Sequence, residues 1–204
     1  MPCWYDIRGL LILKLAYQIT VSELIDWFAR PISKSHLEVA IGSGTVLQKC
    51  LDRRGVWDGG VIDAMDSDGD MVRRARKKLG ACLRECQILD ASRLPELGTK
   101  YDSINLANCV HCFSDPAAVI EAVAKRLNDG GIVSANVLLH PERGGWLAKV
   151  ASVVNWYGQW KGILVRPYTA EEAFGLFDAA GLTRVRTKIS GNCAFIYARK
   201  GQVV

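Results

Sequence analysis

The sequence predicts an α/β fold, a doubly wound, mostly parallel sheet of seven strands that ends in an antiparallel pair of strands and carries a helical cap. Three observations predict it. Short apolar runs alternate with segments whose apolar residues recur at helical spacing. The run at 37–41 passes directly into a glycine turn, and the last two runs are separated only by Ser-Gly-Asn. Because alternating strands and helices need crossover connections, most strands should be parallel.

The elements are expected in a definite order. The predicted strands cover 37–41, 61–66, 86–90, 103–106, 132–139, 183–189 and 193–199. The predicted helices cover 46–54, 71–79, 115–127 and 169–181, after a helical region at 7–29 that ends before Pro31. Pro116 suits a first helical turn, and Thr169 with Glu172 forms a capping-box pattern. The stretch 140–166 is rich in Trp and shows a less regular pattern.

The length and composition indicate one globular domain over residues 1–204, with 1–30 as an N-terminal helical cap and 140–167 as an inserted cap segment. The 204 residues are half hydrophobic and 23% charged. The net charge of +5 is too small for the dense basic footprint of a nucleic-acid binder, so no nucleic-acid partner is expected. Seven cysteines with irregular spacing favour a reducing compartment, and we expect a cytoplasmic protein.

The N-terminal apolar run from Leu10 to Leu15 is too short for a membrane span, and Lys14 interrupts it. No cleavage site of small residues follows clearly, so a signal peptide is not expected. A helix lying on a membrane surface stays open for this segment, as a weak contact and not a span.

The glycine turn holds Gly42, Ser43 and Gly44, where a ligand can approach the backbone closely. The third glycine of a dinucleotide-binding loop is missing, since Leu47 occupies its place. No Gly-Lys-Ser/Thr follows, which excludes a P-loop. On its own this loop is a weak signal.

Acidic residues strengthen that signal. Glu38 lies in the first strand, Asp66 ends the second, and Asp90 ends the third. A carboxylate at such a position binds both hydroxyls of a ribose or accepts from an exocyclic amine. Three acids at three strand ends suit a cationic, adenosine-bearing ligand without phosphates.

The arrangement resembles the class I S-adenosylmethionine-dependent methyltransferases, whose sheet is Rossmann-like, over roughly residues 36–200. Five segments carry the resemblance in order: LEVAIGSGT, DSDGDMVRRARKK, ILDASRLP, YDSINLANCVHCFSDP and RLNDGGIV. It implies S-adenosylmethionine as cofactor and S-adenosylhomocysteine as product.

The resemblance also implies a role for individual residues. Glu38 would orient the methionine amino group through water, Asp66 would bind the ribose hydroxyls, and Asp90 with Ala91 would contact the adenine edge. The remaining implied contacts come from the backbone of Gly42, Ser43 and Gly44, from Ser67 at the adenine face and from Asn108 near the sulfonium. One departure concerns Ala40, which replaces the usual first glycine of the loop. Another is that the run after Asp66 is more polar than usual.

Some of these residues have a purely structural alternative. Asp66 could cap the following helix, and Asp90 could be a turn residue. His111 follows the fourth strand, where an acceptor is expected, and could take a proton from a hydroxyl or simply pack. His140, after the fifth strand, is a weaker candidate for the same role. The cluster Cys109-Val110-His111-Cys112 is too tightly spaced for an ordinary zinc site, so no metal is expected.

Aromatic residues of the two cap segments favour a flat or apolar acceptor, unless they only pack the caps on the sheet. The candidates are Tyr5, Trp146, Trp156 and Trp160. The segment PYTAEEAFGLFDAAGL resembles the small-molecule, ubiquinone- and menaquinone-type branch of the family. We therefore expect methylation of oxygen or carbon on a small, apolar or aromatic molecule. The oligomeric state is left open.

Other functions remain open. The chain could bind the cofactor without turnover, for which Ala40 is a hint. It could methylate arsenite or a thiol, since NCV also resembles the arsenite methyltransferases, although their larger cysteine-bearing C-terminal region is missing. It could be an oxidoreductase with a nucleotide cofactor, against which the absent third glycine argues. The Asn-Pro-Pro-Tyr motif of base amino-group methylation is absent after the fourth strand.

Overall fold

The structure is a computed structural model that describes residues 9, 11–55, 60–141 and 145–201. Seven strands form one sheet in the order β3-β2-β1-β4-β5-β7-β6. Their bounds are β1 Ser35–Val39, β2 Val61–Asp66, β3 Glu85–Ile88, β4 Tyr101–Leu106, β5 Leu127–Leu138, β6 Leu182–Ser190 and β7 Cys193–Lys200. Strands β1 to β5 pair in parallel, and β7 is antiparallel to both β5 and β6. The predicted sheet, with its antiparallel C-terminal pair, is confirmed.

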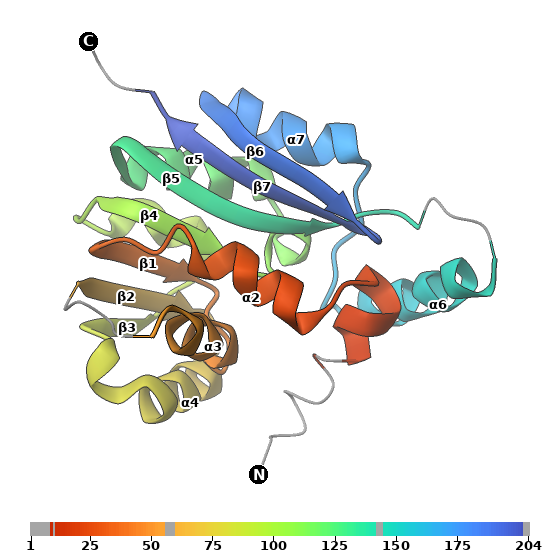
Figure 1. Ribbon diagram of the computed structural model, residues 1–204, viewed down its shortest axis with the longest axis horizontal. Helices are drawn as coiled ribbons and strands as arrows, with labels where there is room; N and C mark the ends of the chain where they lie inside the picture. The colour runs from red at the N-terminus through yellow and green to blue at the C-terminus, as the bar shows by residue number, and fades with distance from the viewer. Residues whose placement is uncertain (1–8, 10, 56–59, 142–144, 202–204) are drawn as a thin grey trace.

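Helices cover both faces of this sheet (Figure 1). The α-helices are α2 Val21–Ala29, α3 Thr45–Arg54, α4 Gly69–Leu79, α5 Pro116–Arg126, α6 Trp146–Trp160 and α7 Ala170–Ala179. Shorter turns are η1 Leu13–Tyr17, η2 Gly80–Cys82, η3 Ala91–Glu96 and η4 Val110–Cys112. Helices α2, α3 and α4 bury their apolar residues on one face, and α5 and α7 bury theirs on the other. The sheet is therefore doubly wound.

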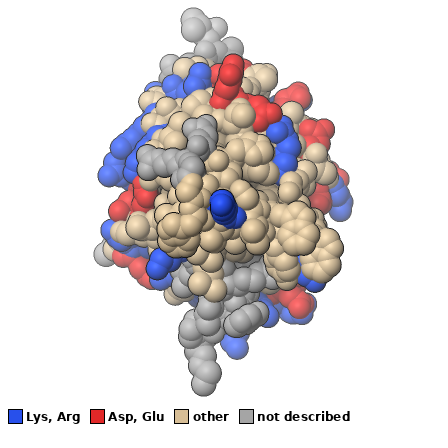
Figure 2. Space-filling model, turned by 90° about the vertical axis from the view of Figure 1, so that its right-hand side faces the viewer, with Lys and Arg blue, Asp and Glu red and all other residues tan. Residues whose placement is uncertain are grey.

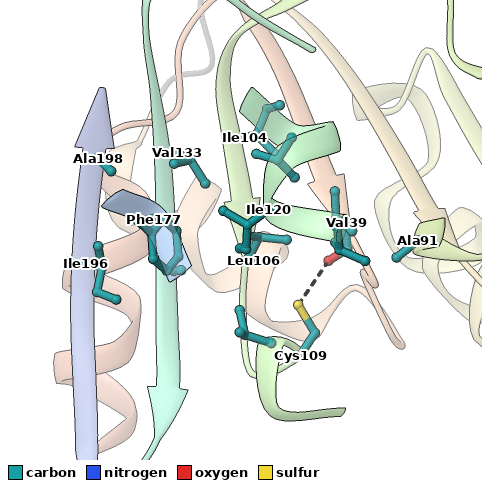
Figure 3. Packing of buried hydrophobic residues seen from close by; sticks show 14 of the residues in the cluster. Val39, Ala91, Ile104, Leu106, Cys109, Ile120, Val133, Phe177, Ile196 and Ala198 are labelled. Carbon is teal, nitrogen blue, oxygen red and sulfur yellow. Dashed lines mark hydrogen bonds between the residues drawn. The ribbon is translucent and has the colours of Figure 1, made fainter. Parts of the chain in front are cut away.

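The core on the α5 face is built from aliphatic side chains of the central strands. Ile104 and Leu106 of β4 pack with Ile120 of α5, and Phe177 of α7 packs near Val133 of β5 (Figure 3). Because residues of one strand alternate between the two faces, Leu37 and Val39 join this core while His36 and Glu38 point to the α2 face.

Side-chain caps explain where several helices begin. Thr20, Asp68 and Asp115 each accept a hydrogen bond from a backbone N–H in the first turn of the helix that follows. Thr169 and Glu172 form both bonds of the capping box that opens α7. Each cap satisfies an N–H that has no partner within the helix, which contributes about 1 kcal/mol.

Two predicted segments differ from the structure. The residues between the predicted helix at 115–127 and the predicted strand at 132–139 lie inside β5, which begins at Leu127 and shifts its register against β4 between Tyr101 and Ser103. The stretch 140–166, expected to be irregular, contains the regular 15-residue helix α6. Apolar residues on both sides of α6 hide the usual amphipathic period. Among the described residues, no helix is both long and apolar enough to cross a membrane.

Candidate functional site

The predicted site residues gather at the carboxyl edge of the parallel strands. The glycine loop follows β1, while Asp66, Asp90 and Asn108 lie at or after the ends of β2, β3 and β4. Since these four strands are neighbours in the sheet, the residues form one continuous edge, with the strand order reversing between β1 and β4.

The glycine loop uses conformations that favour glycine. Gly42 and Gly44 have φ of 60° and 77°. A Cβ on Gly44 would lie 2.9 Å from Leu79 Cδ1 and 3.2 Å from Ala75 Cα. Gly44 is thus required twice, for its backbone angle and for the close packing of α4 against the start of α3.

Asp66 binds the glycine loop directly. Its Oδ2 accepts a hydrogen bond from the Gly42 N–H at 2.8 Å, and its Oδ1 accepts from the Asp68 N–H at 2.9 Å. The cap of α4 is Asp68, which accepts from the Asp70 N–H at 2.7 Å. Asp68, and not Asp66, therefore caps α4, so the capping alternative for Asp66 is wrong. The carboxylate of Asp66 lies beside the glycine loop.

Asp90 combines a turn with a place in the site. Its Oδ1 accepts from the backbone N–H of Ser92 at 2.9 Å and from the Ser92 hydroxyl at 2.6 Å, which caps η3. These bonds lower the pKa of Asp90, so the side chain is a carboxylate at neutral pH. The neighbouring Ala91 is buried, and Ser67 at the end of β2 is exposed. The turn interpretation is thus correct, and it leaves the exposed carboxylate available to a ligand.

Glu38 is buried under α2 in a polar network. Its Oε1 accepts from Asn105 Nδ2 at 2.7 Å and lies 3.0 Å from His36 Nε2. The other ring nitrogen of His36 lies 2.7 Å from the Ser103 hydroxyl. A carboxylate in an apolar strand is costly without partners, and this network supplies them. The predicted contact to a methionine amino group remains a prediction.

Two residues other than glycine have a positive φ at this edge. Ala40 has φ of 54° and Asn108 has φ of 56°. Asn108 is held by Asn136 of β5, whose side chain accepts from the Asn108 N–H at 2.7 Å and donates to its Oδ1 at 2.6 Å. Asn tolerates this conformation readily, whereas Ala pays about 1 kcal/mol or more.

His111 belongs to η4 and is buried against Tyr17 of the N-terminal turn η1. Its Nε2 is 2.5 Å from the Tyr17 hydroxyl, and the Leu138 N–H approaches Nδ1 at 3.5 Å. Burial lowers the pKa of His111 to about 3, so its ring is neutral at physiological pH. In this arrangement the ring ties η1 to the end of β4. Taking a proton from an acceptor would require Tyr17 to move away, so the catalytic role remains a prediction.

The cysteines beside His111 point to separate partners. Cys109 Sγ donates to the Val39 carbonyl at 3.8 Å (Figure 3), and Cys112 Sγ donates to the Asn108 carbonyl at 3.9 Å. Burial raises the pKa of the Cys109 thiol well above its usual range. A buried neutral thiol is a poor nucleophile and a poor metal ligand.

The aromatic cap residues lie outside the strand edge. Trp146, Trp156 and Trp160 belong to α6 and are 70%, 63% and 65% exposed. Tyr5 lies outside the described residues. The exposed fused rings do not enclose the edge formed by the glycine loop, Asp66 and Asp90.

The edge fits an adenosine ligand in its donor and acceptor groups. Two carboxylates at adjacent strand ends match ribose hydroxyls and an exocyclic amine, and the glycine turn leaves the backbone open to a close approach. Asp66 uses one lone pair of each oxygen for the protein, so each oxygen keeps acceptor capacity.

Comparison with known proteins finds a family model that is similar to the part of the chain that holds the site. Residues 37–133 match the family model described as Methyltransferase domain. Over this segment the chain is similar to a methyltransferase domain. The matched segment contains the glycine loop and both site aspartates. No curated protein sequence matches the chain.

Solved structures share the fold of this chain at low sequence identity. An S-adenosylmethionine-dependent methyltransferase from Clostridium acetobutylicum ATCC 824 has a TM-score of 0.69 and 13% identity, and covers 97% of this chain and 99% of its own. An O-methyltransferase family protein from Burkholderia thailandensis has a TM-score of 0.68 and 17% identity. The match covers 98% of this chain and 60% of that protein. An O-methyltransferase family 2 protein from Planctomyces limnophilus DSM 3776, solved with apigenin, has a TM-score of 0.65 and 20% identity. The match covers 96% of this chain and 62% of that protein.

Sequence reasoning missed the residues that support the site. Asn136 holds Asn108, Asn105 and His36 hold Glu38, and Tyr17 holds His111. A signal existed for the two asparagines, because each interrupts an otherwise apolar strand and a buried amide needs partners. Tyr17 is far from His111 in sequence, and nothing in the local pattern pairs them.

Proposed function

We propose that this protein transfers the methyl group of S-adenosylmethionine to oxygen or carbon of a small, apolar or aromatic molecule. The observation that supports the proposal is the hydrogen bond from the Gly42 N–H to Asp66, which holds a carboxylate beside the glycine loop, where we propose that the ribose binds. Two proteins of the same fold support the acceptor class, the enzyme solved with apigenin and a mitomycin 7-O-methyltransferase. A quinone is one acceptor of this kind.

The bound cofactor supplies a methyl group already activated on a sulfonium. The residues of this chain hold it in place. In the proposal Asp66 accepts from the ribose hydroxyls, Asp90 accepts from the adenine amine, and Asn108 borders the sulfonium end. The Asn136 bonds fix Asn108, so this side of the site is preorganised.

A proton must leave when a hydroxyl or a carbon acid is methylated. His111 is our candidate acceptor, and it acts only in a state in which the Tyr17 hydroxyl leaves Nε2. With Tyr17 in place His111 is a positioning residue for η1. A Tyr17→Phe variant separates the two roles, because freeing Nε2 would shift the acidic limb of the kcat profile if His111 is the base.

We also propose a cytoplasmic location and a small-molecule partner. All six described cysteines are free thiols, four of them buried, which suits a reducing compartment. The domain over 1–204 with its two cap segments stays part of this proposal.

Calorimetric titration with S-adenosylmethionine and S-adenosylhomocysteine tests the cofactor site. Asp66→Ala should weaken binding by about 30-fold, since a carboxylate that accepts two hydroxyl bonds contributes about 2 kcal/mol. Asp68→Ala is the matched control. It loses the cap of α4, at about 1 kcal/mol of stability, and should change the affinity less than about threefold.

The outcomes separate the candidate functions. Consumption of cofactor with phenols or quinones supports the proposal, and consumption only with arsenite or thiols supports the alternative acceptor class. Binding without turnover across the panel favours a non-catalytic cofactor-binding protein. Absence of binding by the wild type, together with binding of a nicotinamide cofactor, would reject the proposal.

A further inference from the structure

Helix α6 exposes a continuous stripe of large side chains. Five residues spaced three or four apart, at positions 146, 149, 153, 156 and 160, lie on one side of the helix. With Tyr157 they form what we name the outer stripe: Trp146, Lys149, Val153, Trp156, Tyr157 and Trp160. Its apolar members are between 46% and 70% exposed. A surface helix of a globular protein normally turns such a stripe toward the core.

The opposite side of α6 is already packed. Ala151 is fully buried and Asn155 is 5% exposed, on the side of the helix that faces the body of the protein. Gly158 lies so close to Leu164 that a Cβ there would be 3.2 Å from the Leu164 Cβ. Ala151, Gly158 and the partly buried Val154 therefore pack α6 against the protein, and the apolar members of the outer stripe stay exposed.

The stripe continues into a wider apolar surface. Leu147, Ile163 and Val165 flank it and are 43%, 41% and 47% exposed. Figure 2 shows this end of the molecule as a broad area of uncharged residues around one basic side chain, with most of the other charged residues toward the edges. An apolar patch of this extent on a soluble domain marks an interaction surface.

The segments at this end carry more cations than acids, although Arg166 forms an ion pair with Glu172 of α7 at 2.9 Å. Residues 145–168 contain no Asp or Glu, and neither do residues 11–20, whose turn η1 packs against α6. The same segments contain Lys14, Lys149, Lys161 and Arg166. Lys161 Nζ lies 4.5 Å from the centroid of the Trp160 ring. Cations thus accompany the exposed aromatic rings.

We propose that the outer stripe docks the protein on the surface of an anionic lipid bilayer. Trp and Tyr rings settle at the headgroup level because they are apolar with one polar atom, and cations beside them attract anionic headgroups. A second copy of the chain fits worse. Pairing two outer stripes would bring Lys149 and Lys161 of both copies together without an acid from residues 145–168.

The docked orientation follows from the position of α6. The helix lies beyond the carboxyl edge of β5 (Figure 1), and the Val165 N–H donates to the His111 carbonyl at 3.0 Å. The bilayer would therefore lie near the end of the molecule that carries His111. This inference does not depend on methyl transfer.

Co-sedimentation of the full chain with vesicles tests the proposal. The probes are phosphatidylcholine vesicles and vesicles of phosphatidylcholine with phosphatidylglycerol. We expect binding to the anionic vesicles, weaker binding to the neutral ones, and loss of most binding at high salt. Trp156→Ser with Trp160→Ser should lower the partition coefficient at least about tenfold, and Lys149→Glu with Lys161→Glu should lower it comparably.

Matched variants control for general effects. Val185→Ser with Ile189→Ser removes two similarly exposed apolar side chains from β6, and Lys77→Glu with Lys100→Glu reverses two exposed cations elsewhere. Both should leave the partition coefficient within about twofold. All the altered residues are exposed, so folding is expected to persist and is checked by circular dichroism.

Three results would overturn the proposal. One is absence of sedimentation with anionic vesicles at low salt. Another is binding that the stripe variants and the controls reduce equally. The third is a concentration-dependent dimer, seen by analytical ultracentrifugation, that the Trp156 and Trp160 changes abolish while vesicle binding stays weak, which would assign the stripe to a second copy.

Discussion

The glycine-loop edge and the outer stripe of α6 belong to one molecule and are built in opposite ways. At the edge, polar groups bind one another through Gly42, Asp66 and Asp68, and the backbone is held at unusual angles. On α6 the backbone is an ordinary helix, and the large side chains face outward.

The two regions therefore depend on different parts of the chain for binding other molecules. The edge depends on backbone conformation and close packing, so single atoms there affect both folding and ligand binding. The stripe depends on side chains that the fold does not use, so changes there should affect contacts with other molecules and hardly affect stability.

The largest change in the free energy of unfolding is expected from a substitution at Gly44. Gly44→Ala places a Cβ against Leu79 and Ala75 at a φ of 77°, and should cost about 2–4 kcal/mol of unfolding free energy. Denaturant titration measures it. Gly175→Ala in α7 is the control, since nothing lies within 4 Å of its Cβ and Ala favours helices. Equal costs for both variants would contradict the packing argument.

The next largest effect is the contribution of His111 to the pH dependence of the free energy of unfolding. Burial lowers its folded pKa to about 3, below the ordinary value of 6.5, so between these values the unfolded chain binds a proton that the folded chain does not. Stability should therefore fall as the pH drops from 6.5 toward 3, by up to about 1.4 kcal/mol per pH unit from this group.

His111→Gln removes that contribution. The stability of the variant, measured by denaturant titration at pH 7, 6, 5 and 4, should fall less steeply with acid than that of the wild type. Parallel slopes for wild type and His111→Gln would mean that His111 is protonated in the folded protein.

A smaller effect of opposite sign is expected at Ala40. Ala40→Gly relieves the strain of a φ of 54°, at the cost of a more flexible unfolded chain. We expect a gain of about 0.5–1 kcal/mol in the free energy of unfolding. A loss of stability in denaturant titration would show that the Ala40 methyl group packs usefully.

The smallest effect on stability is expected on α6. Trp156→Ala and Trp160→Ala should each change the free energy of unfolding by less than about 0.5 kcal/mol, because both side chains are more than 60% exposed. Ala151→Leu is the contrast, since it forces bulk into the buried side of α6 and should cost about 1–3 kcal/mol. Comparable losses from all three variants would mean that the outer stripe supports the fold.

The local patterns predicted most elements within a few residues. Caps such as Asp115 and the Thr169–Glu172 box lie at the predicted places because they act over three or four residues. The helix at 146–160 was missed because its apolar residues occur on both sides and Gly145 begins it without a side-chain cap.

The sequence by itself determined the parallel sheet, the antiparallel end and the acids at the strand ends, because period, turns and caps are local properties of the chain. The tertiary structure decided which side chains meet. Asp66 turned out to bind the loop while Asp68 caps the helix, and Tyr17 reached His111 across 94 residues. Such contacts depend on how distant segments pack, so no local pattern contains them.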